Sequence, residues 1–242
     1  KDYTDTLSTL GGADVFYVSN SHIYATDTTY QWSGILNFNY SSEPMTKIAK
    51  YHFEKGKFTY QKARKIRGTI ADSYCMHEQD GNLCLVYNRD LNSGLTNGLC
   101  VLDLNLLGEI GNLGRDESIY ASYFMDNTAY FVTYQETDPV FAVDLSDPSH
   151  PKLKSELKLP GYSDYLHSFG NNQLIGIGID EDDAVKMSVF SIGKNKKLTE
   201  TSRKALTSYI SAMSSLDRHS VLVDEEWQLI GFPASNRDSD ET

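Results

Sequence analysis

Tyrosine and histidine recur at one position of a repeated pattern, and both side chains can take part in chemistry. An imidazole can transfer a proton or bind zinc, and a phenol can donate or accept a hydrogen bond. The position lies four residues before the second residue of each of five short turns, so repeats of one fold would place these side chains at similar depth. The simplest interpretation is packing between repeats, and the alternatives are a polar ring that binds an ion or small ligand, or a zinc site. The members are Tyr17, His77, Tyr123, His167 and Ser214.

A second series lies three residues earlier on the same predicted strands. Its Asp164 and the nearby His167, in the motif GYSDYLH, form the most enzyme-like local pair of the chain. Side chains three residues apart on a regular strand point to opposite faces, which argues against a direct dyad. The chain also has no GxSxG elbow, HExxH motif, P-loop or repeated calcium motif, so we assign no catalytic residue, metal ligand or cofactor. The members are Asp14, Tyr74, Tyr120, Asp164 and Ser211.

Aromatic and acidic side chains gather in predicted loops that would share one rim of the fold. The first loop, DTTYQWSGILNFNYSSEPM, is aromatic, the second is NRDLNSGLTN, and the fourth and fifth are acidic. Aromatic rings beside carboxylates suit sugars, peptides and basic segments of a partner protein. The alternatives are solvated acidic loops and a Trp32 side chain tucked onto its own repeat. The candidate residues are Tyr30, Trp32 and Tyr40 in the first loop, Asp182 in the fourth and Trp227 in the fifth.

These residues are positioned by a repeat whose clearest copy runs from Ser118 to Gly161. Short apolar strands alternate there with turns at Asp126-Asn127, Asp138-Pro139 and Asp147-Pro148. A unit of roughly 40–50 residues with four strands is typical of a β-propeller blade. Turns rich in Asn, Asp and Gly precede strongly apolar strands in the other units too, as expected for two-residue hairpins.

We therefore predict an all-β fold, a β-propeller of four-stranded antiparallel blades with four complete blades and a partial fifth. The blades span about 13–68, 69–118, 119–161, 162–209 and 210–233, in a single propeller domain or propeller fragment over 1–242. An open edge strand invites aggregation, so we hypothesise that Asp5–Leu10 pairs with Gln228–Pro233 and closes five blades. The alternative is an open arc cut from a larger propeller.

Composition narrows the possible partners. The 33 acidic and 22 basic residues give a net charge of −11, which opposes binding to nucleic acid. No apolar run approaches the roughly 20 residues of a membrane helix, so we expect no membrane insertion. Cys75, Cys84 and Cys100 are expected to be buried thiols, although a Cys75–Cys84 disulfide across one hairpin is an alternative. Because the chain begins at Lys1 without Met, we expect it to be part of a larger protein.

The run YFVTYQETDPVFAVDLSDPSHPKL, followed by ELKLPGYSDYLHSFGNNQLIGIG, VKMSVFSI and LIGFP, resembles one family. It is similar to secreted bacterial and archaeal proteins with a C-terminal β-propeller domain distantly related to WD-40 repeats. The resemblance is specific from Ser122 to Gly178 and extends more weakly from Ala13 to about Pro233. It implies a secreted or cell-surface location and no defined enzymatic activity. The present chain is shorter than the family members are expected to be.

The leading functional prediction is a non-catalytic binding or scaffolding propeller that takes a protein, peptide or glycan at the loop rim. The alternative is a carbohydrate-active hydrolase or lyase that uses an axial pocket, which would need a cluster of carboxylates or histidines within hydrogen-bond reach. A third possibility is a blade array that only supports another domain.

Overall fold

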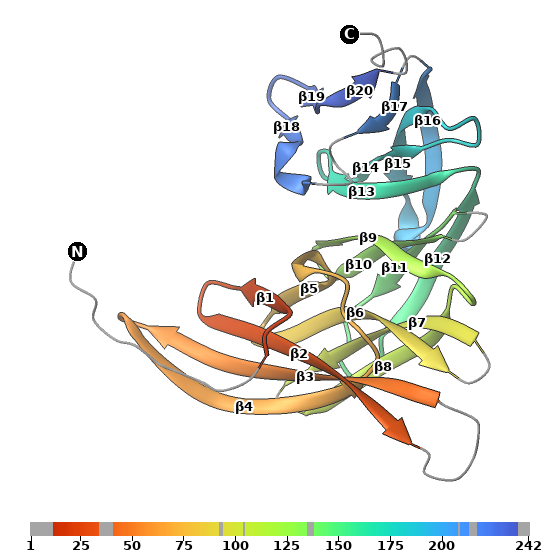
Figure 1. Ribbon diagram of the computed structural model, residues 1–242. Helices are drawn as coiled ribbons and strands as arrows, with labels where there is room; N and C mark the ends of the chain where they lie inside the picture. The colour runs from red at the N-terminus through yellow and green to blue at the C-terminus, as the bar shows by residue number, and fades with distance from the viewer. Residues whose placement is uncertain are drawn as a thin grey trace, which may run out of the picture. The chain divides into compact units, whose positions relative to one another are not determined.

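The computed structural model is built of β-strands joined by turns and short 3-10 helices (Figure 1). It describes residues 12–33, 41–91, 94–103, 105–134, 138–207, 209–212 and 217–236. These residues form two compact units, the first over residues 1–116 with 148–151 and the second over 117–147 with 152–242.

The first unit contains two four-stranded antiparallel sheets, each a meander in chain order. Each is one complete propeller blade. The strands of the first sheet are β1 (Val15–Val18), β2 (His22–Ser33), β3 (Ser41–Glu54) and β4 (Lys57–Arg67), and those of the second are β5 (Met76–Gln79), β6 (Asn82–Leu91), β7 (Gly94–Leu102) and β8 (Leu106–Leu113).

The second unit contains two more complete blades and the partial fifth. The complete blades are β9 (Ser118–Met125), β10 (Thr128–Tyr134), β11 (Asp138–Asp144) and β12 (Lys152–Leu159), then β13 (Tyr162–Ser168), β14 (Gln173–Ile179), β15 (Val185–Ile192) and β16 (Leu198–Leu206). The partial blade consists of β17 (Tyr209–Ala212), β18 (Leu222–Asp224), β19 (Leu229–Gly231) and β20 (Ala234–Asn236).

The partial blade differs from the expected simple meander. Its inner strand β17 pairs with β20, whereas β18 pairs with β19. The fifth of the short turns, predicted at Asp217-Arg218 from the position of Ser214, is not a hairpin turn, because Asp217 instead caps a 3-10 helix over Arg218–Ser220 by accepting the N–H of His219. The proposed pairing partner Asp5–Leu10 lies outside the described residues, so ring closure stays a prediction.

Residues with positive φ form the inner hairpin turns of the second and third blades, as their sequences predict, whereas Asn20 and Ser21 in the turn of the first blade have no positive φ. Asp80 and Gly81 join β5 to β6 with φ values of 50° and 79°, and Asp126 has a φ of 50° between β9 and β10. These values lie in the left-handed region that two-residue hairpins require. The fourth hairpin has a longer turn than predicted, since Phe169 and Gln173 close it around Gly170, Asn171 and Asn172.

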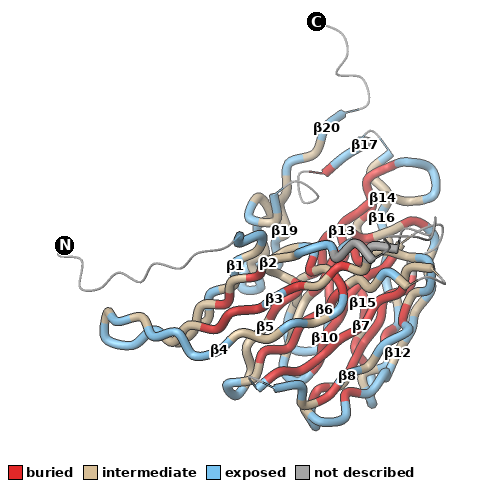
Figure 2. The backbone as a smooth tube through the Cα atoms, turned by 60° about the horizontal axis from the view of Figure 1, so that its bottom comes forward, coloured by how far each residue is buried: buried red, intermediate tan, exposed pale blue. Residues whose placement is uncertain are grey.

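The core runs through the middle strands of the blades, which Figure 2 draws as buried in β6, β7 and β10. In β10, the consecutive residues Tyr130, Phe131 and Val132 are fully buried. Successive side chains point to opposite faces of a strand, so both faces of this sheet are covered. Leu174 and Phe190 of the next blade pack in the same cluster as Tyr130, which joins two blades of the second unit.

Two of the predicted rim loops are largely strand, which corrects the sequence analysis. Tyr30 and Trp32 belong to β2, where they lie opposite Pro44 and Ser42 of β3. The second predicted loop is likewise mostly hairpin, because β6 and β7 stay paired to Leu91 and Gly94. Thr, Tyr and Trp favour extended backbone and cross-strand contact, so these segments continue the sheets. Tyr40 lies outside the described residues.

All three cysteines are buried free thiols, and the alternative Cys75–Cys84 disulfide is absent from the structure. Burial and the charge of Asp80 raise the pKa of the Cys84 thiol to about 12. The thiol therefore stays protonated at neutral pH and packs as a small apolar side chain.

Candidate functional site

The recurring tyrosines of the inner strands reach across to the neighbouring blade of the same unit. The hydroxyl of Tyr17 accepts the backbone N–H of Glu78 at 3.0 Å, and that of Tyr123 lies 3.0 Å from the hydroxyl of Ser168. Glu78 and Ser168 each directly follow a histidine of the series, so the two contacts lie at equivalent positions, one to a backbone N–H and one to a side-chain hydroxyl. The ring of His167 lies 5.1 Å from that of Tyr123 and is stacked on Tyr165. Ser214 lies outside the described residues.

In the first unit, Glu78 forms the centre of a buried polar cluster. Its Oε1 lies 2.8 Å from Nδ1 of His22, and its Oε2 accepts the hydroxyl of Ser19 at 2.6 Å. The side chains of His22 and Glu78 are only 12% and 8% exposed. Burial opposes ionisation of Glu78, but the hydrogen bonds from Ser19 and His22 outweigh it and lower the pKa of the carboxyl. Both carboxylate oxygens are thus engaged in holding the first blade to the second.

His77, the histidine predicted from the series, is half-buried beside this cluster. Burial lowers the pKa of its imidazole, while the nearby charge of Glu78 acts in the opposite direction. A neutral imidazole at pH 7 fits packing at this depth. Glu78, His22 and Ser19 are not among the residues predicted from the sequence, although the position of Glu78 directly after a series member was a usable signal.

In the second unit, three tyrosine rings meet at one end of the strands. Tyr120 lies on β9, Tyr134 ends β10 and Tyr162 begins β13. The ring centroids are 5.5 Å apart for Tyr120 and Tyr134, 5.3 Å for Tyr120 and Tyr162, and 4.5 Å for Tyr134 and Tyr162. The three rings are therefore in mutual contact, and Tyr120 is 42% exposed. We call this group the tyrosine platform.

Two β-bulges shape the platform. Ala121 and Ile119 pair with consecutive residues of β10, so Tyr120 is the extra residue of a bulge in β9. Asp164 is the extra residue of the corresponding bulge in β13, between Ser163 and Tyr165. Bulges re-aim side chains and recur near functional sites. They also break the strict alternation of side chains along a strand. Asp164 and His167 are three residues apart, but because of the bulge their spacing no longer implies that they point to opposite faces of β13.

Acidic side chains lie beside the platform. Burial, and then the charge of Asp164, the two neighbouring phenols and the charge of Asp183, raise the pKa of Tyr162. Asp183 belongs to the predicted acidic loop between β14 and β15, in which Asp180 accepts the N–H groups of Asp182 and Ala184. This cap leaves Glu181, Asp182 and Asp183 exposed. The loop therefore presents carboxylates next to exposed aromatic surface.

The partial blade also contacts the platform strand. The guanidinium of Arg218 donates to the backbone oxygen of Tyr120 at 3.1 Å and fixes the start of β9. Trp227 is 78% exposed in the turn after Asp224, whose carboxylate accepts its backbone N–H at 2.9 Å. The side chain of Trp32 lies outside the described atoms, whereas Tyr30 is exposed on β2 in the first unit.

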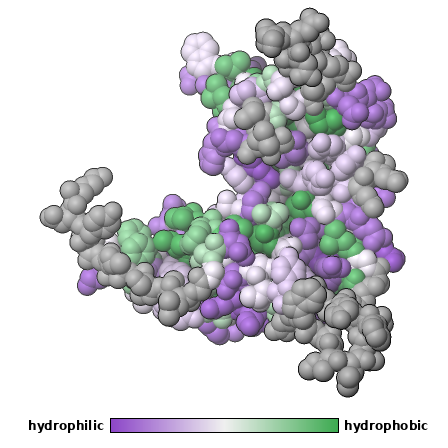
Figure 3. Space-filling view, in the orientation of Figure 1, coloured by the Kyte–Doolittle hydropathy of each residue, from purple (hydrophilic) through white to green (hydrophobic). Residues whose placement is uncertain are grey.

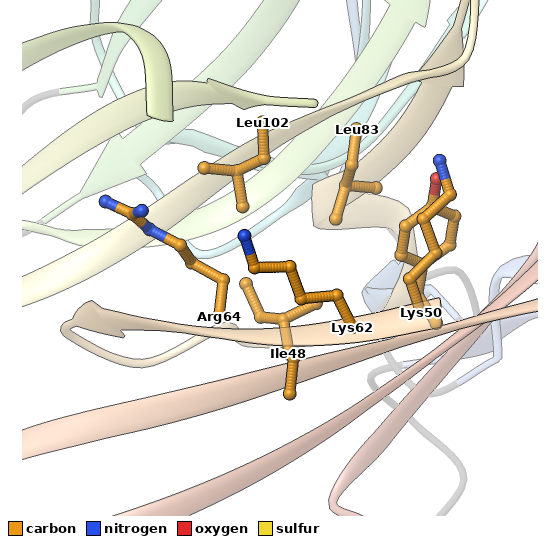
Figure 4. A pocket seen from close by; sticks show the side chains of 8 residues that line it. Ile48, Lys50, Lys62, Arg64, Leu83 and Leu102 are labelled. Carbon is orange, nitrogen blue, oxygen red and sulfur yellow. The ribbon is translucent and has the colours of Figure 1, made fainter. Parts of the chain in front are cut away.

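A small cavity in the first unit lies between β4 and the second sheet. In Figure 4, Lys62 and Arg64 extend from β4 toward Leu102, and Lys50 lies at the far end of the cavity. The ammonium group of Lys50 donates to the backbone oxygen of Gly81 and lies 5.4 Å from the centre of the Tyr24 ring. With a volume of about 20 Å³, the cavity has room for little more than one water.

Other surface features of the described residues are simpler. Hydrophobic residues gather over β1 on the face shown in Figure 3, where Phe16 and Val18 are exposed. Within the described ranges, three or more His, Cys, Asp or Glu side chains nowhere come together as a metal site. None of the helices in the described part of the chain has the length and apolar character needed to span a membrane.

Comparisons with known sequences identify relatives in archaea. An uncharacterized protein of Methanocaldococcus jannaschii is 37% identical over 196 residues, which cover 79% of this chain and 31% of that protein. An uncharacterized protein of Archaeoglobus fulgidus is 33% identical over 200 residues, which cover 81% of this chain and 32% of that protein. The chain therefore spans about a third of the length of the curated relatives it matches.

Comparison with solved structures and with families agrees on the fold. A mutant of the apocarotenoid oxygenase of Synechocystis matches with a TM-score of 0.50 and 8% identity, over 84% of this chain and 52% of that one. At this identity the likeness shows the fold alone. Residues 1–242 match the family described as "Beta propeller domain". With its four complete four-stranded blades and a partial fifth, the chain belongs to the β-propeller domain family.

Proposed function

We propose that the chain is a non-catalytic binding propeller of a secreted or cell-surface protein, and that it captures a basic segment of a partner protein. The observation that carries the proposal is the tyrosine platform, a cluster of three rings in which Tyr120 is exposed and which is flanked by carboxylates. It revises the expected contact surface, because the aromatic residues come from bulged or strand-terminal positions and not from the first loop.

The chemistry of the platform favours a cationic ligand. Lys and Arg side chains are attracted to the faces of aromatic rings, and the carboxylates of Asp164 and Asp183 add charge complementarity. Exposed Glu181 and Asp182 extend the negative field along the loop. Because the platform is held by ring contacts from three strands of two blades, little side-chain freedom is lost on binding.

Binding is favoured over the alternative of carbohydrate hydrolysis or lysis. The candidate acid–base cluster around Glu78 is buried, and Ser19 and His22 already hold both of its carboxylate oxygens. The exposed residues of the platform are instead arranged as a contact surface. Aromatic rings also suit sugars, so a glycan is the competing ligand that the binding test must separate from a peptide.

Replacing Tyr120 with Ala is expected to weaken binding of a Lys/Arg-Gly repeat peptide about tenfold, which corresponds to about 1.4 kcal/mol. The measurement is surface plasmon resonance at low ionic strength, with an equally long Glu-Gly peptide and a neutral oligosaccharide as further analytes. Tyr60→Ala is the matched control, since Tyr60 is 52% exposed on β4 and lies outside the platform.

The proposal is overturned if wild-type protein does not distinguish the basic peptide from the acidic one, or if both variants lose affinity equally. Binding of the neutral oligosaccharide alone, with loss on Tyr120→Ala, would assign the platform to glycans.

The proposed location has its own expected result. In intact cells that produce the parent protein, protease added to the medium should degrade the propeller while a cytoplasmic marker protein survives. An antibody against the chain reports its loss on an immunoblot. Equal protection of the propeller and the marker until the cells are lysed would refute an extracytoplasmic location.

A further inference from the structure

A second, larger pocket of about 170 Å³ lies in the first unit between β4 and the second sheet. It shares Arg64 and Leu102, both labelled in Figure 4, with the small cavity described above. Tyr87 and Cys100 are buried in it, whereas Lys65, Arg67 and Leu106 are exposed and mark its open side. The pocket therefore has a buried floor and a side open to solvent.

The lining of this pocket is strongly basic in a chain whose net charge is −11. Four of the six residues from 62 to 67 are basic, and β4 is the outer strand of its sheet. Like charges that line one pocket repel one another, and an anion bound there would offset this repulsion. The cationic lining residues are Arg64, Lys65, Arg67 and Arg89.

Carboxylates of the protein offset only part of this charge, since a single one among the described residues, Glu109, lines the pocket beside four cationic residues. Glu109 is the acidic residue in the lining, and it accepts the hydroxyl of Tyr87. Nε of Arg67 lies 3.8 Å from Oε2 of Glu43, but both side chains are exposed. Such exposed pairs contribute little to stability because water screens their charges.

One donor in the pocket is conspicuous. Nε of Arg89 is buried and has no hydrogen-bond partner among the described residues. A buried donor without a partner is costly, and a charged one more so. An anion in the pocket would accept this hydrogen bond and recover the cost.

The buried floor of the pocket suits binding and not thiol chemistry. Burial, and secondarily the charge of Glu109, raise the pKa of the Cys100 thiol despite the opposing charge of Arg64. Cys100 therefore remains a thiol. A Cβ at Gly98 would lie 2.6 Å from the Tyr87 ring, so the glycine leaves room for this ring to reach Glu109.

We propose that this pocket binds a tetrahedral oxyanion, a phosphate or sulfate group. Arginine forks match the oxygens of such groups in bidentate geometry. The pocket is smaller than the roughly 300 Å³ at the lower end of sites for drug-sized ligands, so it takes the charged group with at most a small organic part. Ile66, Leu102 and Leu106 give that part an apolar wall. The site goes beyond the proposed function, because the platform lies in the other unit and carries the opposite charge.

The test is isothermal titration calorimetry of the whole chain at low ionic strength, with inorganic phosphate, inorganic sulfate, glucose 6-phosphate, glucose 6-sulfate and glucose. Both inorganic anions and their esters are expected to bind, and glucose is not. Stronger binding of one ester than of its free anion would identify the ester as the source of the group. Raising the salt concentration should weaken binding, because it screens the cations.

Arg64→Gln and Arg89→Gln are each expected to weaken phosphate binding about tenfold or more. Arg115→Gln is the matched control, since Arg115 is 76% exposed in the same unit and lies outside the pocket. The affinity of this variant for phosphate should stay within twofold of that of wild type. Circular dichroism checks that each variant is folded. Arg64 and Arg89 lie on different strands, so one variant remains informative if the other fails to fold.

Failure of wild-type protein to bind any of the anions overturns the proposal, as does an equal loss in Arg115→Gln. Neither outcome bears on the peptide test of the platform, which uses a cationic probe and a different unit.

Discussion

Replacing Glu78 with Gln is expected to lower the free energy of unfolding by about 2–3 kcal/mol. The change keeps the shape of the side chain but removes its charge, so the bonds from Ser19 and His22 lose their charge-assisted strength. The NH₂ end of the Gln amide would also replace one carboxylate oxygen, so it would face a donor from Ser19 or His22 and could not accept its hydrogen bond. Weakening these hydrogen bonds is costly because Ser19 and His22 stay packed against the altered side chain. Urea denaturation at pH 7, followed by circular dichroism, measures the difference.

The effect of Glu78 should depend on pH in a defined direction. The folded-state pKa of this carboxyl is lowered, so the folded protein holds the carboxylate at pH values where the unfolded chain begins to bind a proton. Its contribution is therefore fully present above the unfolded pKa of about 4.3 and is lost as the pH falls through the lower folded value. The difference between wild type and Glu78→Gln should be full at pH 7 and should shrink as the pH falls below about 4.3.

Glu54→Gln is the control for both measurements. Glu54 is exposed on β3, and its Oε2 lies 3.7 Å from Nε2 of His52. An exposed pair of this kind contributes at most about 1 kcal/mol to the free energy of unfolding. A loss in Glu54→Gln as large as that in Glu78→Gln would mean that net charge, and not the buried cluster, sets the stability. An unchanged difference between wild type and Glu78→Gln from pH 7 to pH 3 would rule out the lowered pKa.

The blades could be predicted from the sequence because the signals that define them are local. Turns such as Asp80-Gly81 need residues that tolerate positive φ, and these residue types mark the turns in the sequence. Four complete meanders follow from repeating that signal. Burial on both faces of β10 is likewise visible in its run of consecutive apolar residues.

The long strands and the partial blade could not be predicted in the same way. The polar residues of β2 and β3 resemble loop sequence, yet their pairing persists to Ser33 and Ser41 because each residue finds a cross-strand partner. In the partial blade, β17 pairs with β20 across the intervening β18–β19 hairpin. Such choices depend on contacts between distant residues and not on local pattern.

Only the part of the candidate site that depends on local sequence could be predicted. The acidic loop at Asp180–Asp183 is a local feature, and it lies between β14 and β15. The platform is not local, since Tyr134 and Tyr162 meet from adjacent blades and Tyr120 is aimed by a bulge. A bulge adds one residue without a turn signal, so counting residues along a regular strand misses it.

The second large effect is expected at Gly178, which lies opposite the β13 bulge. An added Cβ there would lie 2.0 Å from the backbone oxygen of Tyr162 and 2.6 Å from Cα of Ser163. Backbone cannot rotate away as a side chain can, so β13 must shift. We expect Gly178→Ala to lower the free energy of unfolding by about 3 kcal/mol. Because Tyr162 belongs to the platform, affinity for the basic peptide should fall as well.

Gly111→Ala separates this steric effect from the loss of a flexible residue. Gly111 lies in β8, and a Cβ there would have nothing within 4 Å among the described residues. Removing a glycine from a strand at no steric cost should leave stability unchanged or raise it by up to about 1 kcal/mol. Urea denaturation and surface plasmon resonance with the Lys/Arg-Gly peptide report both variants. If Gly178→Ala destabilised the protein but bound the peptide as wild type does, the bulged start of β13 would not position the platform, and Tyr162 would have to be dropped from the binding surface.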